Sequence, residues 1–341
     1  MKNSVNESGQ IATRDTTTDV MRLVFMFMIC MVHAVGCDSS RWTHWLTNLC
    51  YSGVLGFVLI SGYYGIRFSW FKVLKIEGVG IGCALTVVVL AAFCDPAAFS
   101  PSHFVQEVLR LFHGYWFIHA YVVVMILANL SSPQTPKHFF PVIIAVYAWS
   151  FLAHLPGARK LLPSTPGLEF FSGITLFAIY LVGRLYRQQD WDAKLKLRWV
   201  LPLMLVCGLV VASVIPPTNT WCGILARYNS PFLLGLAVGL FWLLRRLPSI
   251  SAPWFVKFLH WLTPSVLSIY LIHTNDYGHA VLAGLESDLA NAGLKGIAAY
   301  LVLAAVAFLA GILLDVPRRF FALAISRGGL WKYGIMPPTT A

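Results

Sequence analysis

Two ionisable residues lie in one apolar stretch near the start of the chain, "MRLVFMFMICMVHAVG" at residues 21–36. They are Arg22 and His33, eleven residues apart. At about 100° per residue, eleven residues make roughly three helical turns plus 20°, so both side chains share one side of a helix. An imidazole can accept a proton from a hydroxyl near neutral pH, and a guanidinium can hold phosphate or carboxylate oxygens. The pair is therefore a candidate for acid–base chemistry beside an anionic ligand.

Both side chains also have structural explanations. Arg22 could extend its guanidinium to the inner headgroups, and His33 could bond a neighbouring backbone group or hydroxyl. Polar residues on an apolar membrane helix usually face a hydrated or protein-lined space, because exposure to lipid is costly. We therefore expect Arg22 and His33 to face a cavity, with Arg22 nearer the inner end of the helix and His33 nearer the outer end.

A group of cations follows the second apolar segment, in "FVLISGYYGIRFSWFKVLK". Arg67, Lys72 and Lys75 come after Ser61 and would lie at the inner membrane boundary. Basic residues at such a place commonly anchor a span to the headgroups. They would also form a cationic mouth for a phosphate-bearing ligand that arrives from the cytoplasm.

Polar and aromatic side chains occur near the predicted outer ends of several later segments. The candidates for an acceptor pocket are Trp116, His119, Tyr121, Glu169, Asn229, Tyr270 and His273. Trp116 and Tyr121 also fit an interfacial aromatic belt. Asn229 before Pro231 also fits an ordinary helix start, and Glu169 suits the amino-terminal end of a helix dipole.

The elements that must position these residues are membrane helices. Of the 341 residues, 58% are hydrophobic and 11% are charged, whereas soluble domains carry about 25% charged residues. A spanning helix needs about 20 mostly apolar residues. Candidate spans lie near residues 20–37, 46–66, 73–94, 115–132, 138–155, 168–186, 199–215, 229–246, 257–275 and 293–315, the ninth interrupted by Pro264. The predicted fold is all-α, a polytopic membrane protein with about ten transmembrane helices.

The positive charges orient these spans. If the amino terminus is inside, 18 of the 25 lysines and arginines fall on the inner side, six fall outside and Arg22 lies within the first span. Cytoplasmic loops carry such an excess, so we expect both termini to be cytoplasmic. We expect a disordered cytoplasmic tail at residues 1–19, one membrane domain at 20–320 and a cytoplasmic tail at 321–341. The net charge of +11 then reflects membrane orientation and indicates no nucleic-acid partner.

Cysteine spacing indicates no metal site. The seven cysteines form no CxxC pair and no other metal-ligand spacing. We predict no metal and no permanently bound cofactor. The expected partner of most of the surface is the lipid bilayer, and the expected location is the cell (cytoplasmic, or inner) membrane, as a multi-pass protein.

These segments resemble the acyltransferase 3 family of integral membrane acyltransferases. Arg22, ten intervening residues and His33 match the Arg-x10-His signature at the first helix of that family. Further stretches follow in family order: "FVLISGYY", "YWFIHAY", "LFAIYLVGRLYR", "YNSPFLLGLAVGLF" and "LSIYLIHTN". The resemblance covers roughly residues 20–320. Where the family often has Arg-x-x-Arg after the second helix, this chain has Lys72-Val73-Leu74-Lys75, which binds phosphate without the bidentate fork of arginine.

The resemblance implies transfer of an acyl group, commonly acetyl, from cytoplasmic acyl-CoA to a hydroxyl of an extracytoplasmic carbohydrate or glycolipid. Acyl-CoA would be a co-substrate, and His33 would be the catalytic general base. The donor-binding candidates are Arg22, Ser61, Arg67, Lys72 and Lys75. The outer polar and aromatic candidates would line the acceptor pocket, and the membrane domain is expected to act alone.

Two other classes of membrane protein are consistent with intramembrane polar groups. A secondary transporter or exporter could use Arg22 and His33 as a relay, but transporters often show paired halves, and the sequence has no evident internal symmetry. A glycan polymerase or ligase would usually have large outer loops rich in arginines and acids. The longest predicted outer loop here, near residues 95–114, has only Asp95, Glu107 and Arg110, so we favour the acyltransferase.

Overall fold

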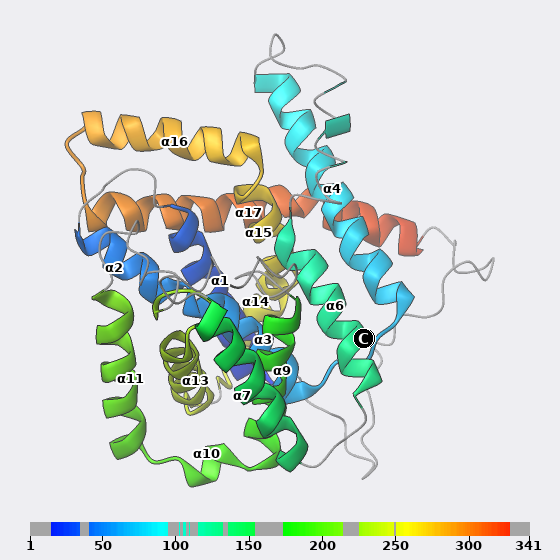
Figure 1. Cartoon of the computed structure of the whole chain (residues 1–341). Coiled ribbons are helices and arrows are strands. Elements are labelled where there is room, and N and C mark those ends of the chain that lie inside the picture. The colour runs from blue at the N-terminus through cyan, green and yellow to red at the C-terminus, as the bar shows by residue number, and fades with distance from the viewer. Residues whose placement is uncertain are drawn as a thin grey trace.

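The computed structural model describes residues 15–34, 41–94, 115–131, 136–153, 173–213, 225–248 and 250–327, together with 102, 105, 106 and 109. Within these residues all regular secondary structure is helical. Five of the described helical segments are long and apolar enough to cross a membrane, and shorter apolar helices accompany them. The chain is thus an all-helical, polytopic membrane protein (Figure 1).

The helices follow one another along the whole described chain. Their bounds are α1 Thr16–His33, α2 Arg41–Cys50, α3 Ser52–Tyr64, α4 Trp70–Cys94, α6 Trp116–Leu130, α7 Pro136–Ala153, α9 Gly173–Gln188, α10 Trp191–Lys194, α11 Leu197–Ala212, α13 Pro231–Arg245, α14 Pro253–Leu262, the 3-10 helix η1 Thr263–Ser265, α15 Val266–His273, α16 Asp276–Asn291 and α17 Ile297–Arg327.

Each apolar segment predicted from the sequence contains a helix or a broken helix. The segment near 46–66 is divided at Tyr51 into α2 and α3, and the segment near 257–275 is interrupted by η1 at Pro264. Proline lacks a backbone N–H and clashes with the preceding turn, which explains the second break. Two of the described helices, α10 and α16, were not predicted. α10 has only four residues, and the mixture of apolar and acidic residues in α16 does not form a long hydrophobic run.

The first and last helices extend beyond their predicted spans. α1 begins at Thr16, inside the segment expected to be a tail, because the carboxylate of Asp15 caps it by accepting from the Thr17 backbone N–H at 3.0 Å and the Thr18 hydroxyl at 2.9 Å. Such a cap satisfies amide groups that the first helical turn leaves without partners. α17 continues to Arg327, beyond the expected membrane boundary near residue 315.

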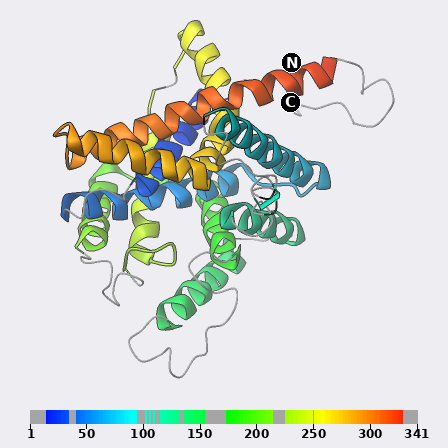
Figure 2. The same ribbon diagram turned by 90° about the horizontal axis from the view of Figure 1, so that it is seen from above.

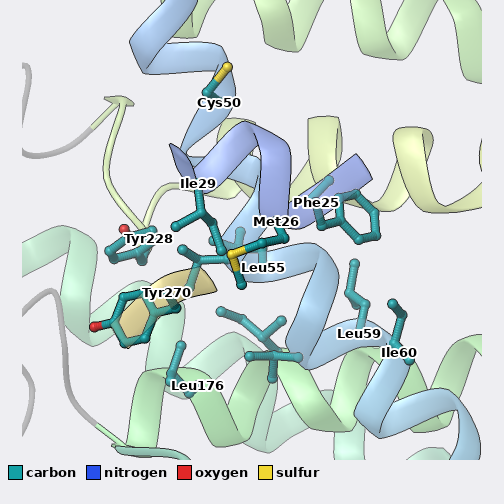
Figure 3. Close-up of a cluster of buried hydrophobic side chains, with 14 of the residues drawn as sticks. Phe25, Met26, Ile29, Cys50, Leu55, Leu59, Ile60, Leu176, Tyr228 and Tyr270 are labelled. Atoms are coloured by element: carbon teal, nitrogen blue, oxygen red, sulfur yellow. The ribbon is translucent and has the colours of Figure 1, made fainter. Parts of the chain in front are cut away.

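Small residues let the central helices approach closely. A Cβ atom on Gly62 of α3 would lie 2.1 Å from the Tyr180 carbonyl oxygen, and one on Gly183 of α9 would lie 2.5 Å from the Leu59 carbonyl oxygen. Any side chain at either position would therefore force α3 and α9 apart, which is the usual reason for glycine at membrane helix interfaces. Figure 3 shows Ile29 of α1 and Leu55 of α3 within the buried cluster formed beside this contact.

One end of the bundle carries a network of charges and phenols, here called the ionic clamp. Its members are Asp15, Tyr63, Tyr64, Asp192 and Arg245. The Arg245 guanidinium donates to Asp15 at 3.2 Å, to Asp192 at 3.1 Å and to the Tyr63 hydroxyl at 2.9 Å, and the Tyr64 hydroxyl donates to Asp15 at 2.6 Å. The clamp thereby joins the start of α1, the end of α3, α10 and the end of α13.

The ionic clamp also changes the acidity of Asp15. Burial opposes ionisation of this carboxyl, but hydrogen bonds from Tyr64 and Thr18 and the charge of Arg245 lower its pKa below the usual value. The carboxylate is therefore the form that the folded protein stabilises.

A second polar cluster holds the broken helix against α17. Asp315 is fully buried and accepts from the hydroxyls of Ser265 at 2.7 Å and Ser268 at 2.6 Å, and from Arg318 at 2.6 Å. Hydrogen bonds of this kind satisfy an acidic group within an apolar bundle. They fix η1 and α15 at a defined position along α17.

Candidate active site

A cavity of about 470 Å³ lies among α1, α3, α4, α6 and α15. Its wall is mostly apolar, with polar groups confined to a few positions. Residues of the predicted site that line this cavity are Arg22, His33, Ser61, Lys72, Lys75, Trp116, Tyr121 and Tyr270. The fold thus brings together, from five helices, side chains that are up to about 250 positions apart in the sequence.

The structure places Arg22 and His33 on the same cavity, with Arg22 about two turns into α1 and His33 at its last residue. A helix rises 1.5 Å per residue, so the cavity extends about 16 Å along this helix. The Arg22 guanidinium lies 3.4 Å from the carboxylate of Asp19, which is fully buried. The other oxygen of Asp19 lies 3.6 Å from Nε2 of His260 on α14. Asp19 therefore restrains the guanidinium within the wall.

The Arg22 end of the cavity also contains hydroxyl groups and two lysines. Lys72 and Lys75 lie in the first turns of α4, and the Lys72 ammonium donates to the Arg67 carbonyl at 2.8 Å. The hydroxyl of Ser61 lies 2.9 Å from that of Tyr121, which links α3 to α6. This end therefore combines positive charge with hydroxyl groups, which suits an anionic ligand.

The His33 end of the cavity is aromatic. The Trp116 and Tyr228 rings lie 5.4 Å apart at a tilt of 33°, and the Tyr270 ring lies 6.0 Å from that of Phe117. Figure 3 shows Tyr228 and Tyr270 on the same side of Ile29. These rings enclose the space beside His33 with flat surfaces of the kind on which sugar rings and other partly apolar ligands pack.

His33 also has imidazole neighbours. The centroid of its ring lies 5.1 Å from that of His273 and 5.9 Å from that of His279. His273 ends α15, and His279 lies in the first turn of α16, a helix that the sequence did not predict. Within the described residues, no group of three or more His, Cys, Asp and Glu side chains has a geometry that could hold a metal ion.

Four predicted site residues lie off this cavity. His119 is on α6 between the lining residues Ile118 and Tyr121, but it does not line the cavity. Two residues of an α-helix make a turn of about 200°, so His119 and Tyr121 point to opposite faces of α6. Arg67 is exposed beside the cavity mouth. The other two are Asn229, which is buried at 2% exposure, and His273, which lines a neighbouring cavity of about 320 Å³. The predicted residue Glu169 lies outside the described residues.

Some lining residues were not among the sequence candidates. Met26 and Ile29 complete a stripe with Arg22 and His33 at helical spacing, a periodicity that the sequence does display. Tyr228 lines the cavity in place of the adjacent Asn229. No sequence signal distinguishes these two neighbours, because their orientation depends on how the turn before α13 packs.

Taken together, one elongated cavity connects cations at one end with an imidazole and aromatic rings at the other. A long, thin ligand with a charged head could place a reactive group beside His33 while its head remains near the lysines. The imidazole could then accept a proton from a second ligand held among the aromatic rings.

Comparison with known proteins gives one result. A family model described as an acyltransferase domain matches residues 16–316. Comparisons with curated proteins and with solved structures found no significant match.

Proposed function

The chain belongs to the acyltransferase 3 family, and we propose that it transfers an acyl group from cytoplasmic acyl-CoA to a hydroxyl of an extracytoplasmic carbohydrate or glycolipid. The acyl group is proposed to be acetyl, and His33 acts as the general base. The observation that carries this proposal is the shared cavity, which is lined by His33 at one end and by Arg22, Lys72 and Lys75 at the other.

We propose that the protein lies in the cell (cytoplasmic, or inner) membrane. It would have ten transmembrane helices, with both termini in the cytoplasm. Contacts between helix ends support this alternation. The ionic clamp joins the start of α1 to the ends of α3 and α13, all of which the topology places inside. His33, at the end of α1, lies beside His273 at the end of α15, and the topology places both outside. Residues 1–14 and 328–341 would belong to cytoplasmic tails.

The donor would enter from the cytoplasmic side. The phosphates of acyl-CoA would lie near Lys72 and Lys75, with Arg67 at the rim, because ammonium and guanidinium groups bind phosphate oxygens. The pantetheine arm is long and narrow, so it could extend along the cavity and bring the thioester to His33. Arg22 lies partway along this route and is restrained by Asp19.

The acceptor would enter from the aromatic end, beside Trp116, Tyr228 and Tyr270. His33 would take the proton of an acceptor hydroxyl as its oxygen attacks the thioester carbonyl carbon. A new C–O bond forms, the C–S bond breaks, and the CoA sulfur leaves as the thiol after receiving the proton from the His33 imidazolium. Ser61, at the Arg22 end, would contact the donor, and Tyr121, expected from the sequence in the acceptor pocket, is now proposed to contact the donor too because its hydroxyl lies 2.9 Å from that of Ser61.

The test is acceptor-dependent release of CoA by the full-length protein in lipid nanodiscs, with acetyl-CoA and glycan-bearing membrane extracts as the two substrates. We expect His33→Ala to lower kcat by about 10²- to 10⁴-fold, the usual contribution of general base catalysis. His44→Ala is the matched control, since His44 lies on α2 and lines neither cavity. It should retain the activity of the unmodified protein.

Two outcomes would contradict the proposal. In the first, the unmodified protein moves a labelled substrate across a vesicle membrane without consuming acyl-CoA. In the second, His33→Ala retains full acyl transfer in well-folded protein.

A further inference from the structure

His273 holds an imidazole nitrogen that has no hydrogen-bond partner within the described part of the chain. The side chain is buried at 2% exposure, and its Nδ1 lies 2.5 Å from the backbone carbonyl oxygen of Ile269. A carbonyl oxygen only accepts hydrogen bonds, so Nδ1 must carry the hydrogen of the neutral ring. The distal nitrogen, Nε2, then carries a lone pair, and among the residues that the structure describes it is buried without a hydrogen-bond partner.

A buried acceptor without a donor destabilises a protein, and one that persists next to a reactive group indicates a functional role. The surroundings of His273 are Cys30, whose sulfur lies 4.0 Å from Nδ1, and the rings of Tyr270 at 6.2 Å and His33 at 5.1 Å. The His33 and His273 rings meet edge to face, with 67° between their planes. A rotation of the His33 ring could turn one of its nitrogens, as an N–H donor, toward Nε2 of His273.

The backbone around His273 is shaped to hold this arrangement. After α15 the chain reverses sharply into α16, and a Cβ atom on Gly278 would lie 2.2 Å from the Ile272 carbonyl oxygen and 3.1 Å from the Cα of His273. Only glycine fits such an approach. The reversal lays α16 beside α17 (Figure 2) and brings His279 to 5.9 Å from His33. The end of α15 is therefore fixed from two directions.

We propose that His273 is a positioning residue for His33, a role that rests on the proposed function. Its Nε2 accepts the N–H of one His33 nitrogen, so that the other His33 nitrogen keeps its lone pair for the acceptor hydroxyl. His33 gains the hydroxyl proton and later gives it to the departing CoA sulfur, while His273 keeps its own Nδ1 proton throughout.

This arrangement assigns to a neutral imidazole the orienting task that a carboxylate performs in a serine–histidine–aspartate triad. A neutral partner suits a site within the bilayer, because a buried carboxylate there would need a compensating charge. The present separation of the rings fits a site without substrates, since catalytic hydrogen bonds often shorten only when substrates bind.

Two substitutions of His273 separate a positioning role from simple packing. In His273→Gln the side-chain carbonyl oxygen can accept from His33, whereas His273→Leu fills similar space without an acceptor. We expect His273→Leu to lower kcat by about 10- to 100-fold, the size found when a hydrogen bond that orients a metal-ligating imidazole is lost. The KM for acetyl-CoA should stay unchanged, because the lysine end of the cavity is not altered. His273→Gln should recover most of the lost kcat.

A measurement on the unmodified protein avoids any dependence on how the variants fold. Solid-state ¹⁵N spectra of histidine-labelled protein in bilayers report the tautomer of each ring, and the signal missing from His33→Ala identifies His33. We expect a single His33 tautomer in the unmodified protein and in His273→Gln, and a mixture in His273→Leu.

Full kcat in His273→Leu would overturn the proposal, as would an equal mixture of His33 tautomers in the unmodified protein. Equal losses of kcat in well-folded His273→Leu and His273→Gln would also overturn it, because the imidazole itself would then be required. Failure of the proposed function is a distinct result, in which the unmodified protein transfers no acyl group although the tautomer spectra show a single His33 form.

Discussion

The two ends of the cavity differ in how they hold polar groups. At one end, the Arg22 guanidinium lies 3.4 Å from Asp19, and the ionic clamp beside it pairs Arg245 with Asp15 and Asp192. At the other end, the rings of His33 and His273 meet edge to face, and no described residue forms a hydrogen bond with Nε2 of His273. The charges of Arg22 and Arg245 are thus matched by carboxylates, whereas His33, proposed for proton transfer, and its neighbour His273 are imidazoles, which are neutral until they are protonated.

This difference has a physical reason. A permanent charge within or beside the bilayer must be paired or reach water, because lipid solvates it poorly. An imidazole is neutral through much of its working range and needs only hydrogen bonds. The charged end can therefore contribute to both stability and donor binding, while the imidazole end can be specialised for catalysis. The following predictions test that division, from the largest expected effect to the smallest.

The largest effect on stability is expected for Arg22→Leu. This change leaves the fully buried Asp19 carboxylate without its guanidinium, which should reduce the free energy of unfolding by about 3 kcal/mol. The double variant Arg22→Leu with Asp19→Leu should regain that stability without regaining acyl transfer. His33→Ala should leave stability nearly unchanged, and chemical unfolding in detergent micelles would measure all three.

Full acyl transfer by the double variant would contradict a role of the charged end in donor binding, since Arg22 would then serve only to neutralise Asp19. A loss of stability in His33→Ala as large as that in Arg22→Leu would contradict the specialisation of the imidazole end for catalysis.

A smaller loss of stability is expected for Arg245→Leu. The change removes the donor shared by Asp15, Asp192 and Tyr63, and hydrogen bonds to charged groups suggest a loss of about 2 kcal/mol. Arg198→Leu is the matched control, because Arg198 is exposed on α11 and lies outside the clamp; its effect should remain within about 0.5 kcal/mol. Thermal unfolding in nanodiscs would measure both, and equal shifts for the two variants would show that the clamp does not stabilise the folded protein.

A kinetic effect of about 1.4 kcal/mol is expected when Lys72 and Lys75 are both changed to Ala. The KM for acetyl-CoA should rise about tenfold with little change in kcat, because phosphate contacts act equally in the ground and transition states. Added salt should reduce the difference from the unmodified protein. Lys194→Ala with Lys196→Ala removes the same charge from exposed positions near α10 and should leave the KM unchanged. An unaltered KM in the first pair would remove these lysines from the donor site.

The smallest effect concerns pH. Because the pKa of Asp15 is lowered in the folded protein, its contribution to stability is present at neutral pH. That contribution is lost as the pH falls from about 4 through the folded-state pKa. Asp15→Asn should therefore reduce the loss of unfolding free energy that occurs as the pH falls below about 4. Above pH 6 the dependence of stability on pH should be unchanged. If the unmodified protein and Asp15→Asn lost the same stability in acid, the clamp would not favour the ionised carboxyl of Asp15.

Several features of the site were accessible from the sequence because they depend on local periodicity. The spacing of Arg22 and His33 places them on one side of any helix, and the structure finds both on one cavity. Pro264 predicted the break that η1 forms. The order of apolar and cationic segments also placed Lys72 and Lys75 beside Ser61, and all three line the cavity.

Other features required contacts between distant segments. The sequence could not show that Tyr228 lines the cavity and Asn229 does not, nor that His119 points away from it. Adjacent residues point in different directions, so these outcomes depend on how each segment is rotated when it packs. It also did not reveal α16, whose position depends on the close approach of Gly278 to Ile272.

By itself, the sequence determined that the chain is an all-helical membrane protein and that an arginine and a histidine share a helix face, because hydropathy and the 3.6-residue period act over short distances. Only the tertiary structure decided which groups meet. It paired Arg245 with Asp15, 230 residues away, and brought His273 to His33. Such pairings depend on how several helices pack against one another, and no local pattern records that packing.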